Sequence, residues 1–307
     1  MTTAVVFAYH NVGVRCLSVL LAHGVDVPLV VTHNDNPDEK IWFESVAALA
    51  AKHSVPAITP DDPNLADTVY RIRALQPDFL FSFYYRLLLK APLLALPRRG
   101  ALNMHGSLLP KYRGRVPVNW AIIHGETQTG ATLHYMTEKP DNGDIVAQSA
   151  VPILPDDTAG EVFDKVSVAA ELTLYDAVPA LVAGTAPRTP QDLGQRQYFG
   201  GRKPEDGRIG WRQSAAQVHN LVRAVAPPYP GAFTDLPAGR LVVERTRVAA
   251  AGRQHETAPR LHCADGRLYA DCGTGTLEIL SATLDGTPLT AAAFQQRFGG
   301  SLPLPAG

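Results

Sequence analysis

Short apolar runs alternate with helix-like segments through the first 190 residues of the chain. The opening run, Ala4 to Ala8, is continuously apolar, as expected of a strand that is covered on both faces. The next segment, Val14 to His23, carries apolar residues at helical spacing and ends at Gly24. Such alternation predicts an α/β fold with a mostly parallel sheet between two layers of helices. Further strands are predicted over 27–31, 56–58 and 79–83, and further helices over 42–53 and 65–75.

The pattern of the chain changes after about residue 200, where short β-rich runs are separated by turn signals. Ala264-Asp265-Gly266 and Asp285-Gly286 are two of these signals. They predict a small antiparallel barrel as a second domain, so we expect one domain over 1–200 and another over 201–307. Between the two regions the sequence predicts paired strands over 132–136 and 145–153, and a long helix from Thr158 to about Ala183.

Composition excludes several classes of protein. The 307 residues are 46% hydrophobic and carry 28 Lys/Arg against 29 Asp/Glu, which is not the balance of a disordered chain. A net charge of −1 also argues against a protein that mainly grips nucleic acid. The N-terminus lacks the basic region of a signal peptide, and its apolar run is too short to span a bilayer. We therefore expect a cytoplasmic protein without membrane insertion.

The stretch from Asn103 to Arg115 contains the most unusual side chains. It follows a short apolar run that predicts a strand, so Asn103 and His105 would project from the same face near its carboxyl end. Ligands bind at that edge in open α/β sheets. An amide can stabilise an oxyanion and an imidazole can move a proton, which suits acyl-group chemistry. The alternative is that Asn103 caps a turn and His105 fills a gap.

The second candidate segment is Pro140-Asp141-Asn142-Gly143-Asp144, between the two later strands. These residue types are typical of an ordinary turn. A carboxylate in such a loop can also orient a catalytic imidazole, fix its tautomer and favour its protonated form. The ten histidines and three cysteines show no spacing typical of a metal site, so no metal is expected.

Taken together, these segments resemble the formyltransferases that use 10-formyltetrahydrofolate. The resemblance lies in Asn103-x-His105-x-Ser107-Leu108-Leu109-Pro110, in Arg113-Gly114 and in Asp141-x-Gly143. It covers nearly the whole chain and implies a Rossmann-like first domain followed by a barrel similar to an OB fold. It also implies that Asn103, His105 and Asp141 are catalytic, and that 10-formyltetrahydrofolate is the formyl donor.

The folate-binding segments of the family correspond to two stretches and one single residue of this chain. We expect their contacts with folate to be made by backbone groups, with the leucine side chains as an apolar wall. The corresponding residues are Leu87, Leu88, Leu89, Arg115, Thr137, Glu138, Lys139, Pro140 and Asp141.

Within the family, the chain most resembles the branch that acts on UDP-4-amino-4-deoxy-L-arabinose. The matching stretches include Phe81-Ser82-Phe83-Tyr84-Tyr85-Arg86 and Lys111-Tyr112-Arg113-Gly114-Arg115. A nucleotide-linked amino sugar carries a diphosphate, which one or two Arg side chains can hold. Arg113, Arg202 and Arg223 are candidates, although each could instead be structural or solvated. Residues 196–307 carry 13 Lys/Arg and 9 Asp/Glu, a net of +4, which is compatible with an anionic small ligand.

Two other functions stay open. A methionyl-tRNA formyltransferase shares the core motif, but it must hold a polyanion. The loop from Thr32 to Lys40 has three acids and one base where that branch generally has a basic loop, so no nucleic-acid partner is expected. The chain could also be an inactive homologue that only binds folate or a nucleotide sugar. The sequence gives no indication of an oligomeric state.

Overall fold

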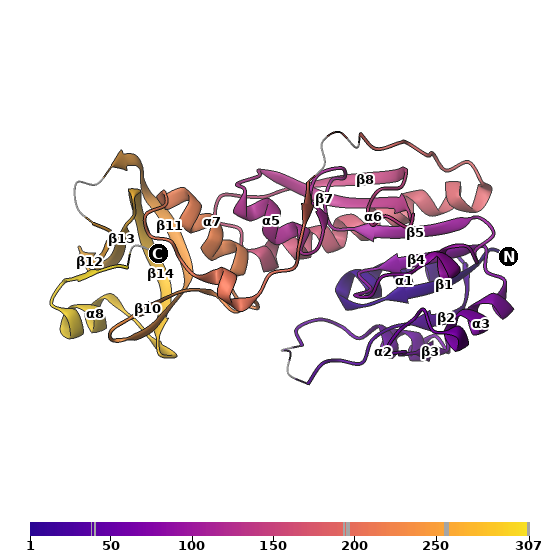
Figure 1. Ribbon diagram of the computed structural model, residues 1–307, viewed down its shortest axis with the longest axis horizontal. Coiled ribbons are helices and arrows are strands. Elements are labelled where there is room, and N and C mark those ends of the chain that lie inside the picture. The colour runs from indigo at the N-terminus through magenta and orange to yellow at the C-terminus, as the bar shows by residue number, and fades with distance from the viewer. Residues whose placement is uncertain (38, 40, 193, 195–196, 255–257, 306–307) are drawn as a thin grey trace. The chain divides into compact units, whose positions relative to one another are not determined.

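A computed structural model of the chain describes residues 1–37, 39, 41–192, 194, 197–254 and 258–305. Contacts within the chain divide it into two compact units, which are drawn in Figure 1. The first unit comprises Met1–Pro117, Gln128–Val151 and Asp164–Gly200. The second comprises Val118–Thr127, Pro152–Phe163 and Gly201–Gly307. The domain limits expected from the sequence, 1–200 and 201–307, stay a prediction. Two short segments before residue 200, 118–127 and 152–163, group with the second unit.

The first unit is built on a sheet whose strands follow the order β3-β2-β1-β4-β5-β7-β8. Strands β1 to β5 run parallel to their neighbours, whereas β7 is antiparallel to β5. This arrangement confirms the mostly parallel α/β sheet, and the run predicted as the first strand is almost completely buried. The strands are β1 (Thr3–Ala8), β2 (Asp26–Val31), β3 (Ala57–Ile58), β4 (Phe79–Phe83), β5 (Gly100–His105), β7 (Gln128–Tyr135) and β8 (Ile145–Pro152).

The prediction of a helix over 42–53 is wrong in its first part. The helix begins only after Ser45, whose hydroxyl caps it by accepting a hydrogen bond from the Ala48 amide at 3.2 Å. Trp42 and Phe43 instead pack against the ring of His10, at centroid distances of 4.5 and 4.0 Å. The other helices before residue 190 are α1 (His10–Ala22), α3 (Ala66–Leu75), α4 (Ala91–Leu94), α5 (Pro117–Ile123) and α6 (Ala159–Ala183), and the helix after Ser45 is α2 (Val46–Lys52).

Two short strands lie outside the main sheet. Strand β6 (Arg113–Gly114) pairs in parallel with β9 (Tyr198–Phe199), so the segment that follows Asn103 and His105 is held by residues near the end of the first unit. Tyr112 also stacks on Phe199 at a centroid distance of 5.2 Å. The chain around Arg113 is therefore fixed by pairing rather than left as a free loop.

The second unit contains an antiparallel sheet in the order β10-β11-β14-β13-β12-β16. Irregular register between β11 and β14 marks β-bulges, which curl the sheet into a half-barrel. The predicted antiparallel second domain is thereby confirmed. Its elements are the 3₁₀ helix η2 (Pro204–Gly207), α7 (Ala215–Val225), β10 (Ala232–Leu236), β11 (Gly239–Gln254), β12 (Arg260–Ala264), β13 (Arg267–Asp271), β14 (Thr274–Leu284), β15 (Thr287–Pro288), α8 (Ala291–Phe298) and β16 (Ser301–Pro303).

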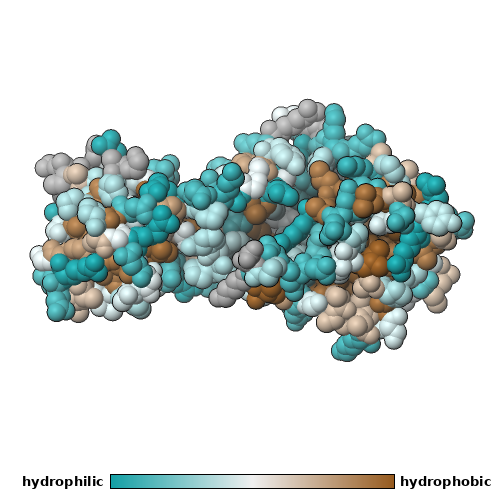
Figure 2. Space-filling model, turned by 60° about the horizontal axis from the view of Figure 1, so that its bottom comes forward, coloured by the Kyte–Doolittle hydropathy of each residue, from teal (hydrophilic) through white to brown (hydrophobic). Residues whose placement is uncertain are grey.

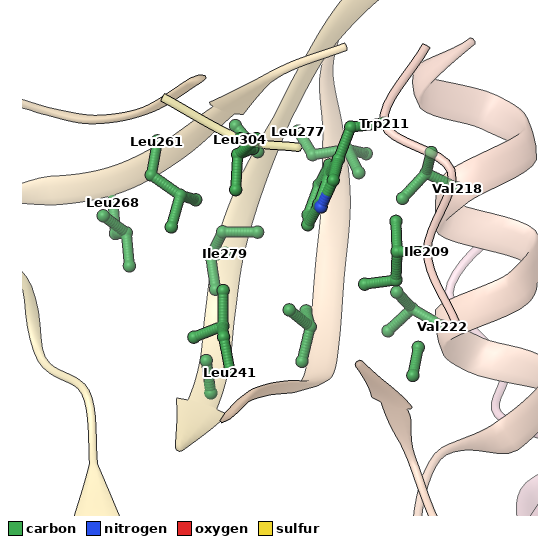
Figure 3. Packing of buried hydrophobic residues seen from close by; sticks show 14 of the residues in the cluster. Ile209, Trp211, Val218, Val222, Leu241, Leu261, Leu268, Leu277, Ile279 and Leu304 are labelled. Atoms are coloured by element: carbon green, nitrogen blue, oxygen red, sulfur yellow. The ribbon is translucent and has the colours of Figure 1, made fainter. Parts of the chain in front are cut away.

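Trp211 lies at the centre of the hydrophobic core of this second unit. Its indole ring is completely buried, beside Leu277 and Leu304 and facing α7, as Figure 3 shows. Its indole N–H has no hydrogen-bond partner among the described residues. The ring therefore contributes to the core by packing alone.

Helix α6 is the one described helix that is long and apolar enough to cross a membrane. Half of its most apolar 18-residue stretch is buried inside the fold. Thr173 of this helix donates a hydrogen bond to the Ser149 hydroxyl of β8 at 2.7 Å. Core helices share this length and composition, so these properties alone do not indicate a membrane span. Figure 2 shows one face of the molecule, which is mostly hydrophilic with apolar residues between the hydrophilic ones. Several apolar side chains of α6 are exposed. The exposed ones on this helix are Val168, Leu172, Tyr175 and Val182.

Candidate functional site

Asn103 and His105 lie on one face of β5, as the sequence predicts, and β7 supplies the polar residues opposite them. The antiparallel register pairs Asn103 with His134 and His105 with Thr132. Directly opposed residues share a face of the sheet, so the four side chains form one polar patch. His105 and His134 are buried, with 6% and 1% of their surfaces exposed, whereas Asn103 is partly exposed. The patch therefore combines a reachable amide with two shielded imidazoles.

Both nitrogens of the His105 ring face acceptors. Nε2 donates a hydrogen bond to the Tyr112 carbonyl oxygen at 2.8 Å, and Nδ1 lies 3.5 Å from Oδ1 of Asp141. A protonated ring has a proton on each nitrogen and can satisfy both acceptors, whereas a neutral ring can satisfy one. The surroundings of His105 therefore match its charged form.

Asp141 is held as a carboxylate. Burial opposes its ionisation, but the charge of His105 and the hydrogen bond from the Gly114 amide are among the causes that keep its pKa well below the usual range. Its Oδ2 accepts a hydrogen bond from the Gly114 amide at 2.9 Å. The backbone of Asp141 has a φ of 55°, in the left-handed region that non-glycine residues seldom adopt. The loop therefore holds this carboxylate in place at a conformational cost.

The loop that contains Asp141 folds back along the face of the sheet. Strand β7 ends beside the start of β5, because Leu102 pairs with Tyr135, yet Asp141 reaches His105 at the other end. Gly143 permits the return, since a Cβ atom there would lie 1.9 Å from the Tyr135 carbonyl oxygen. The Gln191 side-chain amide donates to the carbonyl oxygens of Asp141 and Gly143 at 3.0 and 2.7 Å.

The segment after β5 is tied to the same face by Thr132. Its hydroxyl donates to the Ser107 carbonyl oxygen at 2.6 Å and accepts from the Leu109 amide at 3.1 Å. The Ser107 hydroxyl in turn donates to the Lys111 carbonyl oxygen at 2.7 Å. Before this turn, Gly106 leaves room for Tyr84, whose hydroxyl oxygen would lie 2.0 Å from a Cβ atom at that position. The Ser-Leu-Leu-Pro stretch is thus a fixed turn.

The predicted folate segments occupy two loops of the first unit. In the loop after β4, Leu87 and Leu88 are exposed, by 38% and 68%, and Asn64 holds the loop by donating to the Leu88 carbonyl oxygen at 3.0 Å. Leu89 is instead 6% exposed and packs in the core with Leu93, so its side chain does not form an outer wall. In the loop after β7, Thr137, Glu138 and Lys139 are exposed, Pro140 is half-buried, and Arg115 lies exposed after β6.

The difference between Leu88 and Leu89 leads to a testable prediction. Replacing the buried Leu89 by alanine should lower the free energy of unfolding by about 2–5 kcal/mol, because a cavity is left in the core. Replacing the exposed Leu88 by alanine should change it by less than about 0.5 kcal/mol. Urea denaturation of the two variants measures both values. Equal destabilisation would contradict the assignment of Leu89 to the core.

The three arginines predicted for the substrate lie in different surroundings. Arg113 is buried in the first unit and donates to the Gln191 side chain at 3.2 Å, so it is linked to the Asp141 loop. Arg202 and Arg223 belong to the second unit. Arg223 is buried, burial lowers its pKa, and it donates to Asn220 Oδ1 at 2.8 Å, which is a structural setting. Arg202 lies over the ring of Trp120 at 4.9 Å, and its Nε atom is buried without a hydrogen-bond partner among the described residues.

His134 and Gln191 are the site residues that the sequence analysis misses. His134 sits on a predicted strand, and only the strand register places it opposite Asn103. The available signal is the pair Thr132 and His134, which are two residues apart and match the spacing of Asn103 and His105. Gln191 lies far along the chain and gives no such signal. Among the described residues, no group of three His, Cys, Asp or Glu side chains is arranged to hold a metal ion.

Two family models match this chain. The model described as formyl transferase matches residues 16–178, which is more than half of the chain. The model described as formyl transferase, C-terminal domain, matches residues 202–299. Together they span the polar patch on β5 and β7 and all strands of the half-barrel except β16.

Solved structures of other proteins share this fold. An N-formyltransferase from Helicobacter canadensis, in complex with folinic acid and dTDP-3-aminofucose, is 18% identical with a TM-score of 0.68, over 91% of this chain and 99% of that one. WlaRD, a sugar 3-N-formyltransferase, is 17% identical with a TM-score of 0.69, over 91% and 97%. A sugar N-formyltransferase from a Shewanella species is 18% identical with a TM-score of 0.64, over 80% and 96%. At such identities the likeness shows the fold alone.

Proposed function

Because the chain belongs to the formyl transferase family, we propose that it transfers a formyl group from 10-formyltetrahydrofolate to the amine of a nucleotide-linked amino sugar. The observation that carries the proposal is the approach of Asp141 to His105, at 3.5 Å, beside the partly exposed Asn103 of the polar patch. The acceptor we favour is UDP-4-amino-4-deoxy-L-arabinose. With that acceptor the product would enter lipid A modification and polymyxin resistance, as the resemblance to that branch implies.

The reaction requires one bond to form, one to break and one proton to move. The neutral amine attacks the formyl carbon, and the carbonyl oxygen becomes an oxyanion in the tetrahedral intermediate. The bond from that carbon to N10 of the folate then breaks, the amine nitrogen loses a proton and N10 gains one. We assign the oxyanion contact to the Asn103 amide, because it is the partly exposed donor of the patch.

His105 is assigned to stabilise the oxyanion with its charge and to take part in the proton transfer, with Asp141 orienting it. The ring is held at both nitrogens, by Tyr112 and by Asp141. For a proton to pass through the ring, one of these contacts must open, and the 3.5 Å approach to Asp141 is the longer of the two. An imidazolium that is already in place stabilises negative charge without reorganisation of its surroundings.

The nucleotide-sugar acceptor is supported by its chemistry and by the solved neighbours. Two of the solved neighbours are complexes with a dTDP-linked amino sugar or with dTDP, in each case together with a formylated folate. Within this chain, the buried Nε atom of Arg202 has no hydrogen-bond partner among the described residues, and a diphosphate oxygen would supply one. Arg113 is also proposed as an acceptor contact, through its place beside the Asp141 loop.

The acidic loop after β2 discriminates against tRNA less strongly than its composition indicates. Glu39 is paired with Arg86 through two hydrogen bonds of 2.7 Å, so its charge is compensated within the protein. Asp35 accepts a hydrogen bond from the Tyr9 hydroxyl at 2.7 Å. Asp38 and Lys40 lie outside the described residues. The loop supplies no cluster of free basic side chains among its described residues, so a sugar nucleotide is still the favoured acceptor over methionyl-tRNA.

A competition assay tests the proposal. The protein is given 10-formyltetrahydrofolate together with UDP-4-amino-4-deoxy-L-arabinose, a dTDP-linked 3-amino sugar and methionyl-tRNA, and the formylated product is identified by mass. We expect the UDP sugar to gain 28 mass units, the mass of CO, and the tRNA to stay unmodified. Preferential formylation of the tRNA would overturn the choice of acceptor. Folate binding without transfer to any amine would favour the inactive homologue.

A further inference from the structure

His134 is the more deeply buried of the two imidazoles in the polar patch, and the assigned reaction does not use it. Its Nε2 atom lies 3.1 Å from Nδ2 of Asn103, within hydrogen-bond distance, and its exposed surface is 1%. Its Nδ1 atom lies 2.8 Å from the Tyr135 carbonyl oxygen. We propose that His134 is a positioning residue, which holds the Asn103 amide in the orientation that presents an N–H group to the oxyanion. The proposal rests on the proposed transferase function.

The backbone selects the tautomer of His134. A carbonyl oxygen can only accept, so Nδ1 must carry the proton that it donates to Tyr135. In the neutral ring Nε2 then has a lone pair and must accept. The only group of the Asn103 side chain that can donate to it is the NH₂ group. The contact therefore determines which end of the amide faces His134.

The orientation of Asn103 determines what the substrate meets. An NH₂ group has two protons, so one can bond His134 while the other stays available for the oxyanion. Without an acceptor at position 134 the amide can rotate by half a turn and present its carbonyl oxygen instead. That oxygen would repel the developing negative charge. The fixed tautomer of His134 on β7 thus keeps the Asn103 amide on β5 in its donating orientation, and the strand pairing sets the separation of the two residues.

Asp141 lies close to the contact between Asn103 and His134. Its Oδ1 atom lies 3.6 Å from Nε2 of His134, close to its 3.5 Å distance from Nδ1 of His105. Asp141 thus stands between the two rings. The His134 ring cannot swing away from Asn103 without breaking its bond to Tyr135. Asn103, His134, Asp141 and His105 therefore form one connected unit.

A double-mutant cycle tests the proposal through kcat. Phenylalanine at position 134 keeps a planar ring but offers no acceptor, whereas glutamine places an oxygen near the position of Nε2. We expect His134→Phe to lower kcat at least about tenfold with little change in KM, and His134→Gln to restore most of the loss. In the Asn103→Ala background, measured by single turnover, His134→Phe should have less than about a twofold effect. His219→Phe, a change of another buried histidine, should leave kcat unaltered.

Two outcomes would overturn the proposal. One is an equal loss of kcat in both backgrounds, which is the behaviour of a merely structural residue. The other comes from the side-chain amide resonances of Asn103 in ¹⁵N-asparagine-labelled protein, which should shift in His134→Phe. Unchanged resonances would show that the contact does not exist. This second measurement needs no activity, so a wild-type protein that formylates no acceptor would refute the proposed function while the contact with His134 is still tested.

Discussion

Replacing Asn103 by alanine is expected to lower the turnover number about 100- to 1,000-fold, the usual loss when one preorganised oxyanion donor is removed. The KM values for the formyl donor and the amine should change little, because the amide acts mainly on charge that develops during the reaction. Steady-state kinetics with 10-formyltetrahydrofolate and the acceptor found by competition measure both parameters.

Asn119→Ala is a matched control for this experiment. Asn119 also donates a hydrogen bond through its amide, to the Ala224 carbonyl oxygen at 2.7 Å, but it is buried and lies in the second unit. Its loss should reduce stability and leave the turnover number close to that of the wild type. A near-normal turnover number in Asn103→Ala would contradict the assignment of the oxyanion contact.

Replacing Trp211 by alanine is expected to lower the free energy of unfolding of the second unit by about 3–5 kcal/mol. The ring is completely buried among Leu277, Leu304 and residues of α7, so its removal leaves a large cavity. Trp211→Phe should cost much less, because the indole N–H makes no hydrogen bond with the described residues that phenylalanine would lose. Urea denaturation followed by circular dichroism gives the unfolding midpoints of the wild type, Trp211→Ala and Trp211→Phe.

An exposed aromatic residue provides the comparison. Tyr70 is 73% exposed on α3, and its replacement by alanine should change the stability by less than about 0.5 kcal/mol. If Trp211→Ala destabilised the chain no more than Tyr70→Ala, the half-barrel would not depend on this ring. The core of the second unit would then have to be described differently.

Much of the first unit could be predicted because its strands are buried on both faces. A run such as Ala4 to Ala8 has few other stable environments, and two-residue spacing alone places Asn103 and His105 on one face. The cap of the long helix was equally readable, since the Thr158 amide donates to Glu161 Oε2 at 2.7 Å. These features depend on neighbours in the sequence, which is why the sequence suffices for them.

The rest depends on partners that are distant along the chain. Trp42 and Phe43 are apolar at positions that fit a helix, but the His10 ring offers them a packing surface outside one. His134 can be recognised as a site residue only from its pairing with Asn103 on the neighbouring strand. The path of the Asp141 loop follows from contacts with Gly114 and Gln191, which no local pattern reveals.

The antiparallel pairing of β7 with β5 has a consequence for how such a protein can diversify. The distance between Asn103 and His134 is fixed by the ladder of hydrogen bonds between the two strands and not by the chain that joins them. Outside the residues that hold the site, such as Tyr112 and Gly114, that connecting stretch can therefore vary while Asn103 and His134 keep their spacing. A change of acceptor can therefore be made in the rest of this connecting stretch while the two strands keep their sequence.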